Sequence, residues 1–475
     1  MSNDICRMTA IELLAAYESG EFSPVAVTEA VLGRIHDLQQ VYNAFCLIDD
    51  DGAMAAARQS EKRWLAGAPE GRLDGVPATV KDLVLAKGWP TMRGSKTTDP
   101  DQSWDEDAPA VARLREHGAV LLGKTTTPEF GWKGVTDSPL TGVTRNPWNT
   151  ERTPGGSSGG AAVAALCGMG PLHIGTDGGG SVRIPSSFSG IFGIKANFGR
   201  VPVYPASPFG TLSHLGPMTR TVADAALMLS VMAESDPRDA FGLPYEARDY
   251  GAVLDGGVAG LRAAYSPDLG YATVDPEVAA LVAAAVKSLE ALGVTVEQTD
   301  PGFDNPQDIF RSHWYAGAAF VLNSMMTPEQ LELVDPGLRV VAEQGDAITM
   351  DNYFKAGLAR SRLAVTMRQF HETYDLLLTP TMPLPAFSLS SDTPIGADGS
   401  AWDDWSPFTY PFNLPGQPAA TVPCGFTTAG LPVGLQIVGR NYDEATVLRA
   451  AQAYENAHPE HSRTPDMPIN IGKSA

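Results

Sequence analysis

The sequence predicts an α/β sandwich. From about residue 73 onward, short β-branched runs such as GVPATVKDLVL alternate with helical stretches and glycine-rich loops, an alternation typical of α/β proteins. Apolar residues make up 43% of the 475 residues and charged residues 19%, which indicates a globular chain rather than a disordered one. This length could bury one large core or two or three ordinary ones.

Several elements have ends that can be recognised in the sequence. The first 65 residues are expected to be helical, because apolar residues in IELLAAY and VTEAVLGRI recur at helical spacing. Asp107 precedes a helix that Gly118 closes, and AVLLG follows as a strand. Asp275 and the proline after it open the helix EVAALVAAAVKSLEALG, which the strand VTVEQ follows. Near the C-terminal end, LPVGLQIVG predicts a strand and Asp443 caps the helix EATVLRAAQAYENA.

Charge and cysteine content exclude several classes of function. A formal net charge of -21 repels nucleic acid and anionic lipid surfaces, so neither is expected as a partner. The four cysteines form no CxxC pair, which argues against a zinc cluster and suits a reducing cytoplasm. The N-terminus lacks the apolar block of a signal peptide, and the apolar run from Ala161 to Leu166 is too short to span a bilayer. We therefore expect a cytoplasmic protein without metal, cofactor or membrane.

The first candidate site motif is TPGGSSGG, residues 153–160. Four glycines around Ser157 and Ser158 give the backbone conformations that are closed to other residues. The following AAVAAL begins a helix, whose N-terminal N–H groups favour negative charge. The alternative is a flexible turn without function.

The second motif is GTDGGGSVRIP, residues 175–185. Three glycines before Ser181 can direct several backbone N–H groups into one concavity, which suits a developing oxyanion. Alternatively, it is a tight turn in which Asp177 accepts hydrogen bonds from backbone amides.

The third candidate is Lys81, in the strand-like stretch VPATVKDL. Burial of a lysine disfavours its charged form and lowers its pKa from about 10.4, which makes it a base near neutral pH. The competing interpretation pairs Lys81 with Asp82 at a surface edge.

Together these motifs resemble the amidase signature family. The resemblance covers most of the chain, and the 24-position spacing from Ser157 to Ser181 fits the family pattern. Its further motifs are GAVLLGKTTTPEFG, NPWNTERTPGGSSGGAAVAA, GTDGGGSVRIPSSFSGIFGIK, NLPGQPAATVPCGF and GLPVGLQIVG.

The resemblance implies a metal-free amide hydrolase with an acyl-enzyme intermediate. Ser181 would be the nucleophile, Ser157 a bridging serine after a cis peptide bond, and Lys81 the general base. The oxyanion hole would use the backbone N–H groups of Gly178, Gly179, Gly180 and Ser181. The residues expected to hold these loops in place are Ser158, Asp177 and Arg183.

The family also implies one domain over residues 1–475, an α/β/α sandwich around a large mixed, twisted β-sheet, and we find no linker between domains. Residues 231–275 and 385–405 are expected to be surface excursions. The expected segments are a helical N-terminus (1–65), a catalytic core (66–230), a variable substrate-side region (231–400) and a C-terminal return to the core (401–475).

Other motifs allow competing functions. GAVLLGKT, residues 118–125, matches a phosphate loop, but its strand lies between the two glycines rather than before the first. GSSGG, residues 156–160, matches a nucleophile elbow, which requires an acid and a histidine such as His313, His371 or His458. A scaffold without activity would leave three coincident motifs unexplained.

The main alternative within the family is the A-type subunit of a glutamyl- or aspartyl-tRNA amidotransferase. DDWSPFTYPFNLPGQPA is more similar to free-standing acylamidases, and the charged segment usual in the tRNA-type subunit is not found between about 330 and 365. An esterase or a carbamate (urethane) hydrolase would use the same acylation chemistry.

The substrate is expected to be a small apolar or aryl acylamide. Apart from Arg183, we find no basic group suited to anchoring a substrate carboxylate. The family comparison also implies a homodimer. The candidate substrate-binding residues are Thr141 in the loop Asp137–Gly142, Trp132, Trp314, Tyr315, Phe408 and Phe412.

Overall fold

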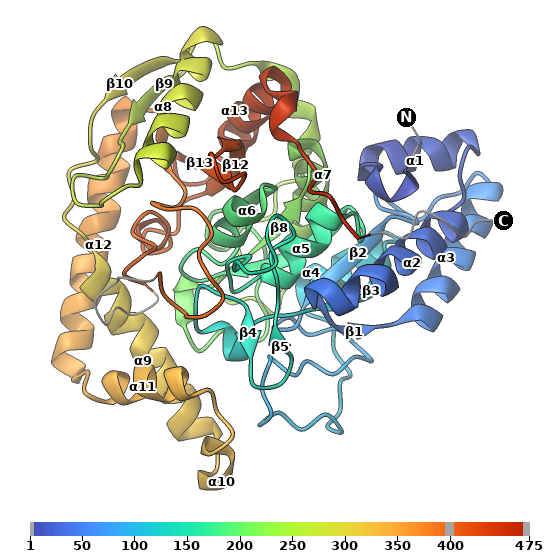
Figure 1. Ribbon diagram of the computed structural model, residues 1–475, viewed down its shortest axis with the longest axis horizontal. Coiled ribbons are helices and arrows are strands. Elements are labelled where there is room, and N and C mark those ends of the chain that lie inside the picture. Colours follow the sequence, from blue (N-terminus) through green and yellow to red (C-terminus); the bar gives the residue numbers. More distant parts are fainter. Residues whose placement is uncertain (1–3, 395–402, 469–475) are drawn as a thin grey trace.

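The protein is an α/β sandwich built on one large mixed β-sheet (Figure 1). This computed structural model describes residues 4–394 and 403–468. Within them the main sheet has eleven strands, in the order β1-β3-β2-β6-β8-β7-β12-β13-β11-β9-β10. Strand β2 is parallel to β3 and β6, and β9 is parallel to β10 and β11, whereas the other neighbours are antiparallel. The predicted fold class is confirmed.

The strands of the described residues are β1 Phe45–Ile48, β2 Pro77–Lys81, β3 Val120–Thr125, β4 Asp137–Ser138, β5 Gly142–Val143, β6 Leu172–Asp177, β7 Phe192–Lys195, β8 His214–Thr219, β9 Arg262–Tyr265, β10 Thr295–Gln298, β11 Leu376–Pro380, β12 Ala419–Phe426 and β13 Pro432–Gly439. The α-helices are α1 Ala10–Ser19, α2 Pro24–Tyr42, α3 Asp50–Leu65, α4 Pro109–Glu116, α5 Gly159–Cys167, α6 Arg183–Ser189, α7 Val222–Met232, α8 Pro276–Ala291, α9 Gln307–Met325, α10 Pro328–Leu331, α11 Pro336–Asp346, α12 Met350–Thr373 and α13 Glu444–Ala457. None of the helices in the described ranges combines the length and apolar character that crossing a membrane requires.

The helix starts follow from local capping. The Asp275 carboxylate accepts hydrogen bonds from the first turn of α8, and Asp443 does the same for α13, as predicted. Helix α4 begins at Pro109 without a side-chain cap. Asp107 instead accepts a hydrogen bond from the N–H of Lys87 at 2.7 Å.

Two expectations for the segments were wrong. The first 65 residues are not wholly helical, because β1 pairs with β3 at the sheet edge. Residues 231–275 are not only a surface excursion, because β9 lies between β11 and β10 with Ala263 and Ala264 fully buried. The second expected excursion, 385–405, includes the buried residue Trp405. Residues 395–402 of that excursion, with the expected segment boundary at 400–401, lie outside the described residues.

The sheet carries helices on both faces. Alternate residues of β6, Leu172 and Ile174, pack in one apolar cluster with α7, α8 and α13. Helices α5 and α6 contact the opposite face through a second cluster that includes Val182 and Met218. Because β2 and β6 are parallel neighbours, with Val80 opposite Ile174, their carboxyl ends meet at the same edge. This places Lys81 next to the glycine-rich loop that follows β6.

Candidate active site

Lys81 is the last residue of β2, and its side chain is fully buried. The Nζ atom lies 2.7 Å from Ser157 Oγ, 2.8 Å from Ser158 Oγ and 2.8 Å from Thr176 Oγ1. Three hydroxyl groups therefore surround the amine. The structure brings two of the three predicted catalytic side chains into direct contact.

Burial lowers the pKa of Lys81 well below 10.5, and the nearby negative charge of Asp177 opposes this shift only in part. The surface pair of Lys81 with Asp82 does not form. The Asp82 carboxylate instead pairs with Lys124 at 3.3 Å and accepts hydrogen bonds from the N–H groups of Met92 and Gly94. Lys81 is thus separated from the carboxylate next to it in the sequence.

The loop TPGGSSGG leads into α5, and the peptide bond between Gly156 and Ser157 is cis, as the family resemblance implied. Gly156 has no space for a side chain, since a Cβ there would lie 2.3 Å from the carbonyl oxygen of Val135. The Ser158 hydroxyl accepts from the N–H of Thr176 and lies 3.2 Å from its carbonyl oxygen. This loop is therefore attached to the end of β6.

Ser181 follows three glycines in the turn between β6 and α6, and 7% of its surface is exposed. The N–H of Ser158 donates to the Ser181 carbonyl oxygen at 3.3 Å, which joins the two serine loops. The Gly180 N–H donates to Asp177 Oδ1 at 2.8 Å and is already occupied. Within the described residues, the N–H groups of Gly178, Gly179 and Ser181 have no hydrogen-bond partner.

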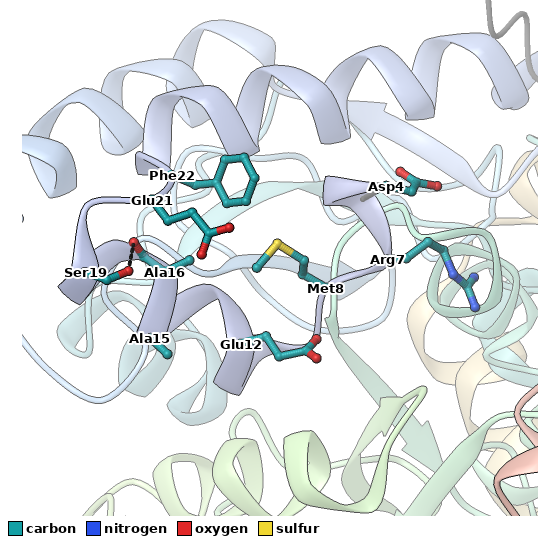
Figure 2. A pocket seen from close by; sticks show the side chains of 9 residues that line it. All are labelled: Asp4, Arg7, Met8, Glu12, Ala15, Ala16, Ser19, Glu21 and Phe22. Carbon is teal, nitrogen blue, oxygen red and sulfur yellow. Dashed lines mark hydrogen bonds between the residues drawn. The ribbon is translucent and has the colours of Figure 1, made fainter. Parts of the chain in front are cut away.

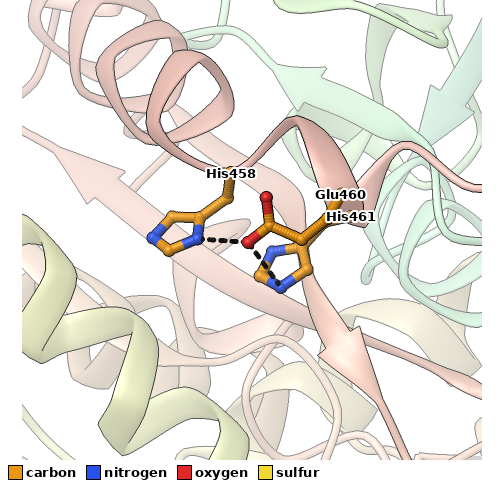
Figure 3. A group of neighbouring side chains, drawn as sticks. All are labelled: His458, Glu460 and His461. Atoms are coloured by element: carbon orange, nitrogen blue, oxygen red, sulfur yellow. Dashed lines mark hydrogen bonds and ion pairs between the residues drawn. The ribbon is translucent and has the colours of Figure 1, made fainter.

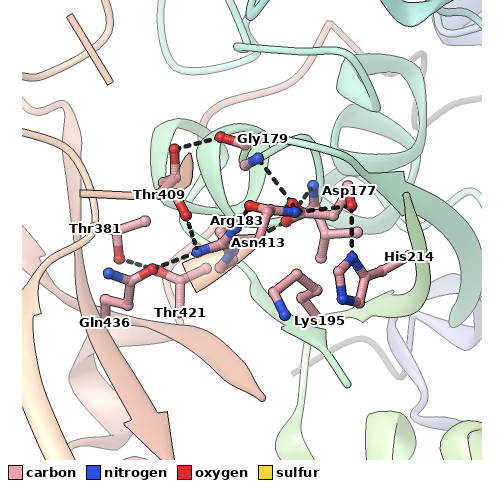
Figure 4. Close-up of polar contacts among 12 residues, drawn as sticks. Asp177, Gly179, Arg183, Lys195, His214, Thr381, Thr409, Asn413, Thr421 and Gln436 are labelled. Atoms are coloured by element: carbon pink, nitrogen blue, oxygen red, sulfur yellow. Dashed lines mark hydrogen bonds and ion pairs between the residues drawn. The ribbon is translucent and has the colours of Figure 1, made fainter. Parts of the chain in front are cut away.

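Arg183 is fully buried below the glycine turn and holds it in place (Figure 4). The guanidinium binds Asp177 through two hydrogen bonds of 3.0 Å. Its other contacts are to the carbonyl oxygen of Thr409, to Asn413 and to Gln436. The positive charge of Arg183, together with Lys195 and the Asn413 amide, holds the pKa of Asp177 well below its usual range despite burial. Arg183 is therefore a structural group and is not available to a substrate carboxylate.

Thr409 closes the same loop from the C-terminal part of the chain. The Thr409 hydroxyl donates to the carbonyl oxygen of Gly179 at 2.6 Å (Figure 4). Gly180 has a φ of +135°, and a Cβ there would lie 2.4 Å from Thr409 Oγ1. Only glycine fits this close approach.

Aromatic side chains pack against the glycine turn. The ring of Trp314 contacts Gly178, where a Cβ would meet Trp314 Cζ3 at 2.6 Å. Trp314 stacks on Phe209 with ring centroids 4.0 Å apart and on Phe310 at 5.5 Å. The Trp314 indole N–H donates to the carbonyl oxygen of Trp132. All of these side chains belong to one apolar cluster, which also contains Tyr315, Phe408 and Phe412.

Thr141 lies apart from this cluster. It sits in the turn between β4 and β5, and its hydroxyl contacts Ser138 Oγ at 2.8 Å. Residues 135–137, just before this turn, border a small hollow of about 20 Å³ that Asp392 also lines. Because Val135 also touches Gly156, this loop adjoins the first serine motif.

Two further features lie away from the serines. An open hollow of about 710 Å³ is lined by N-terminal residues between Asp4 and Phe22 (Figure 2). At the end of α13, His458, Glu460 and His461 offer ligand atoms within 4.8 Å of one another (Figure 3). Neither group includes a residue of the two serine loops, so neither supplies a group to the chemistry there.

The competing motifs have structural explanations. Lys124 of the apparent phosphate loop is buried, donates a hydrogen bond to Thr91 Oγ1 at 2.5 Å and forms an ion pair with Asp82. The histidines required by a nucleophile elbow have other partners. His371 contacts Gln417 and the Tyr374 carbonyl oxygen. His313 packs against Tyr353, and His458 is paired with Glu460.

Sequence reasoning missed several residues of this site. Thr176, the third hydroxyl at Lys81, stands in the GTDGGGS motif, but nothing in the motif marks it as a partner of the lysine. Asn413 and Gln436 bind Arg183 from 230 and 253 positions away in the chain. Both stand in C-terminal motifs that carried the family resemblance, and that was the available signal.

Comparison with known proteins gives consistent matches. The family model described as Amidase matches residues 26–448. An acylamidase of Rhodococcus erythropolis is 38% identical over 464 residues, covering 96% of this chain and 97% of the relative. The A-type subunit of the glutamyl-tRNA(Gln) amidotransferase of Myxococcus xanthus is 37% identical over 481 residues, with coverage of 95% and 97%.

Solved structures give the same result. A bacterial aryl acylamidase of the amidase signature family superimposes with a TM-score of 0.90 at 29% identity, covering 96% of this chain and 97% of the other. A substrate complex of 6-aminohexanoate cyclic dimer hydrolase gives a TM-score of 0.88 at 29% identity, with coverage of 97% and 99%.

Proposed function

Because the chain belongs to the amidase signature family and hydrolyses amide bonds, we propose that it acts as a free-standing acylamidase on small apolar or aryl acylamides. The proposed enzyme is a cytoplasmic homodimer that cleaves the amide in two steps through an acyl-enzyme. The contact of a fully buried Lys81 amine with Ser157 Oγ at 2.7 Å carries the proposal. It gives a serine hydroxyl a base whose pKa burial has lowered.

In the proposed first step, uncharged Lys81 accepts the Ser157 hydroxyl proton while Ser157 accepts the Ser181 proton. Ser181 Oγ forms a bond to the substrate carbonyl carbon, and the carbonyl π electrons move to its oxygen. When the tetrahedral intermediate collapses, the C–N bond breaks and the relay returns the proton to the leaving nitrogen. Water then attacks the acyl-enzyme by the same route, releasing the acid and restoring Ser181.

The proposed oxyanion hole consists of the N–H groups of Gly178, Gly179 and Ser181. Gly180 is left out of this set because its N–H donates to Asp177. The three remaining donors precede or belong to the nucleophile, which places the oxyanion next to the bond that forms. Removing one such donor costs about 3–4 kcal/mol of transition-state stabilisation.

The aromatic cluster supports the substrate class. Trp314 contacts Gly178, a proposed oxyanion donor, and stacks on Phe209. An apolar acyl or aryl group at this wall would gain contact area without pairing a charge. The guanidinium of Arg183 is occupied by protein groups, which disfavours an anionic substrate.

The second candidate is an amidotransferase A-type subunit, which the 37% identity to the Myxococcus xanthus protein supports. The net charge of -21 favours the acylamidase, since a protein that works on tRNA gains affinity from positive charge. The purified chain alone distinguishes the two functions.

The test is turnover of a substrate panel by the purified chain without partners. It contains p-nitroacetanilide, an aliphatic amide, a p-nitrophenyl ester, a carbamate and glutamine. Anilide hydrolysis that Ser181→Ala abolishes, with unchanged circular dichroism, is the expected result. Activity on glutamine alone, or only with added partner subunits, would favour the amidotransferase and contradict the proposal.

A further inference from the structure

Helix α12 carries apolar side chains on two sides. Ala356, Leu363 and Met367 face the interior and are buried. On the outside, Met350 is 76% exposed, and the other members of the exposed row are also largely uncovered. A helix that is apolar on both sides is normally covered on both sides.

The exposed row, here called the α12 stripe, consists of Met350, Phe354, Leu358 and Val365. Phe354 is 66% exposed, Leu358 64% and Val365 54%. Their spacing of four, four and seven residues places all four on one helix face. Figure 1 shows α12 along one edge of the molecule, with α9 and α11 near one of its ends.

The stripe is large enough to form the apolar centre of a protein interface. An aromatic side chain has an area of roughly 150–250 Å² and Met, Leu and Val have somewhat less; because all four residues are more than half exposed, the stripe exposes on the order of 500 Å² of apolar surface. That lies near the upper end for the largest patch of a monomer, about 300–600 Å². It approaches the roughly 800 Å² per partner of a standard interface, whose polar rim supplies the rest.

We propose that the α12 stripe is the contact through which two copies of this chain pair, with the two α12 helices antiparallel across a two-fold axis. This inference rests on the homodimer in the proposed function and not on its chemistry. With the axis between Gly357 and Leu358, Phe354 of one copy faces Ser361 of the other. Leu358 then faces Gly357, and Met350 faces Val365.

Two of these pairings, Phe354 with Ser361 and Leu358 with Gly357, set a large side chain against a small one, whereas Met350 meets Val365 at the ends. The small residues Gly357, Ser361 and Ala364 lie on the same face as the stripe. An isologous contact repeats each pairing on both sides of the axis. Large side chains of one helix therefore enter the gaps of the other, which is how close helix packing is achieved.

Charge along one flank of the stripe fits the same arrangement. Asp351 and Arg362 are both exposed and lie on the same side of the stripe. Within the described residues Arg362 has no ion pair, whereas Asp351 contacts Lys355 at 2.6 Å. Antiparallel pairing brings Arg362 of one copy beside Asp351 of the other. A charged membrane surface would meet both a positive and a negative side chain on this flank, so it would gain less electrostatic attraction than a second copy of the chain.

Sedimentation velocity on the full chain tests the pairing. The wild type is expected at twice the mass of one chain. Leu358→Glu places two carboxylates at the axis and is expected to weaken the dimer at least about a hundredfold. The matched control is Leu65→Glu at the end of α3, where the side chain is 84% exposed and the dimer should persist. A monomeric wild type, or a Leu358→Glu protein that remains dimeric, overturns the proposal.

Cross-linking tests the register. Of the four cysteines, all of which lie in the described residues, Cys46 is exposed and the other three are buried, so Cys46 is first replaced by serine. In that background, Leu358→Cys is expected to form an intermolecular disulfide, because the two copies of position 358 meet at the axis. Val365→Cys, about four turns from its own counterpart, is not. A disulfide at 365 and not at 358 would overturn the antiparallel register.

Two controls separate the dimer proposal from the proposed amide chemistry and from membrane binding. Anilide hydrolysis by Leu358→Glu is expected within about twofold of the wild type, since α12 carries no group of the proposed relay. An inactive wild-type dimer would contradict the proposed chemistry and leave the interface intact. Wild-type co-sedimentation with neutral phosphatidylcholine vesicles, lost in Leu358→Glu, would assign the stripe to a membrane and overturn the dimer.

Discussion

Two fully buried lysines on neighbouring strands allow a test of the proposed base. Lys81 ends β2, and Lys124 lies on β3 opposite Val80. The first contacts three hydroxyl groups, and the second pairs with the Asp82 carboxylate. Replacing each with methionine keeps the chain length and the apolar stem while removing the amine.

The two variants should show opposite patterns: Lys81→Met should lose mainly activity, and Lys124→Met should lose mainly stability. Lys81→Met removes a general base, a loss of about 10²–10⁴-fold in kcat/KM, or about 3–5 kcal/mol. Its stability should fall by only about 2 kcal/mol, because the substitution deprives hydroxyl groups of a hydrogen-bond partner but leaves no buried charge unpaired. Lys124→Met leaves the Asp82 carboxylate buried and unpaired, which costs about 3–5 kcal/mol of stability, while the relay at Ser157 stays intact.

Anilide turnover and urea unfolding on the same preparations provide the measurement. Activity is measured at a temperature where both variants are folded, which circular dichroism confirms. Lys81→Met with activity within about tenfold of the wild type would refute the role of the amine. So would Lys124→Met with an equal loss of kcat/KM, because burial alone would then account for both.

Three further predictions follow from the site. Lys81 has a lowered pKa, so kcat/KM should rise with pH through that pKa as the amine loses its proton. Folding stability should also rise with pH between the lowered pKa and about 10.5, because the unfolded chain binds the proton more tightly there. A rise of kcat/KM with pH that persists in Lys81→Met would contradict this. Arg183→Met leaves the Asp177 carboxylate buried without its ion-pair partner, and thermal unfolding should show a loss of about 3–5 kcal/mol in stability. A loss below about 1 kcal/mol would mean that the Arg183 contacts contribute little to stability. Gly178→Ala places a Cβ 2.6 Å from Trp314; the clash should lower stability, and displacement of the turn should lower kcat/KM about tenfold or more. Adding Trp314→Leu should recover part of the lost stability, and strictly additive effects of the two substitutions on stability would show that the residues do not touch.

Much of the fold could be predicted from local patterns. Apolar periodicity and caps located α8 and α13, and the AVLLG and LPVGLQIVG runs located β3 and β13. The same reasoning missed β1, since FCLI is only four residues between two helices. It also missed β9, because a short apolar run in a glycine- and aspartate-rich region carries no sign of its place inside a sheet.

The sequence by itself determined the chemical groups of the site: the serines, the glycine turn and Lys81, each embedded in its own short motif. Only the tertiary structure decided that Lys81 faces hydroxyl groups rather than Asp82. It also decided that the hydrogen-bond donors of Arg183 are occupied by Asp177, Asn413 and Gln436. The reason is physical. Motifs and periodicity record interactions between neighbours along the chain, whereas the protonation of a buried amine and the partners of a guanidinium depend on strands and loops that meet only when the sheet closes.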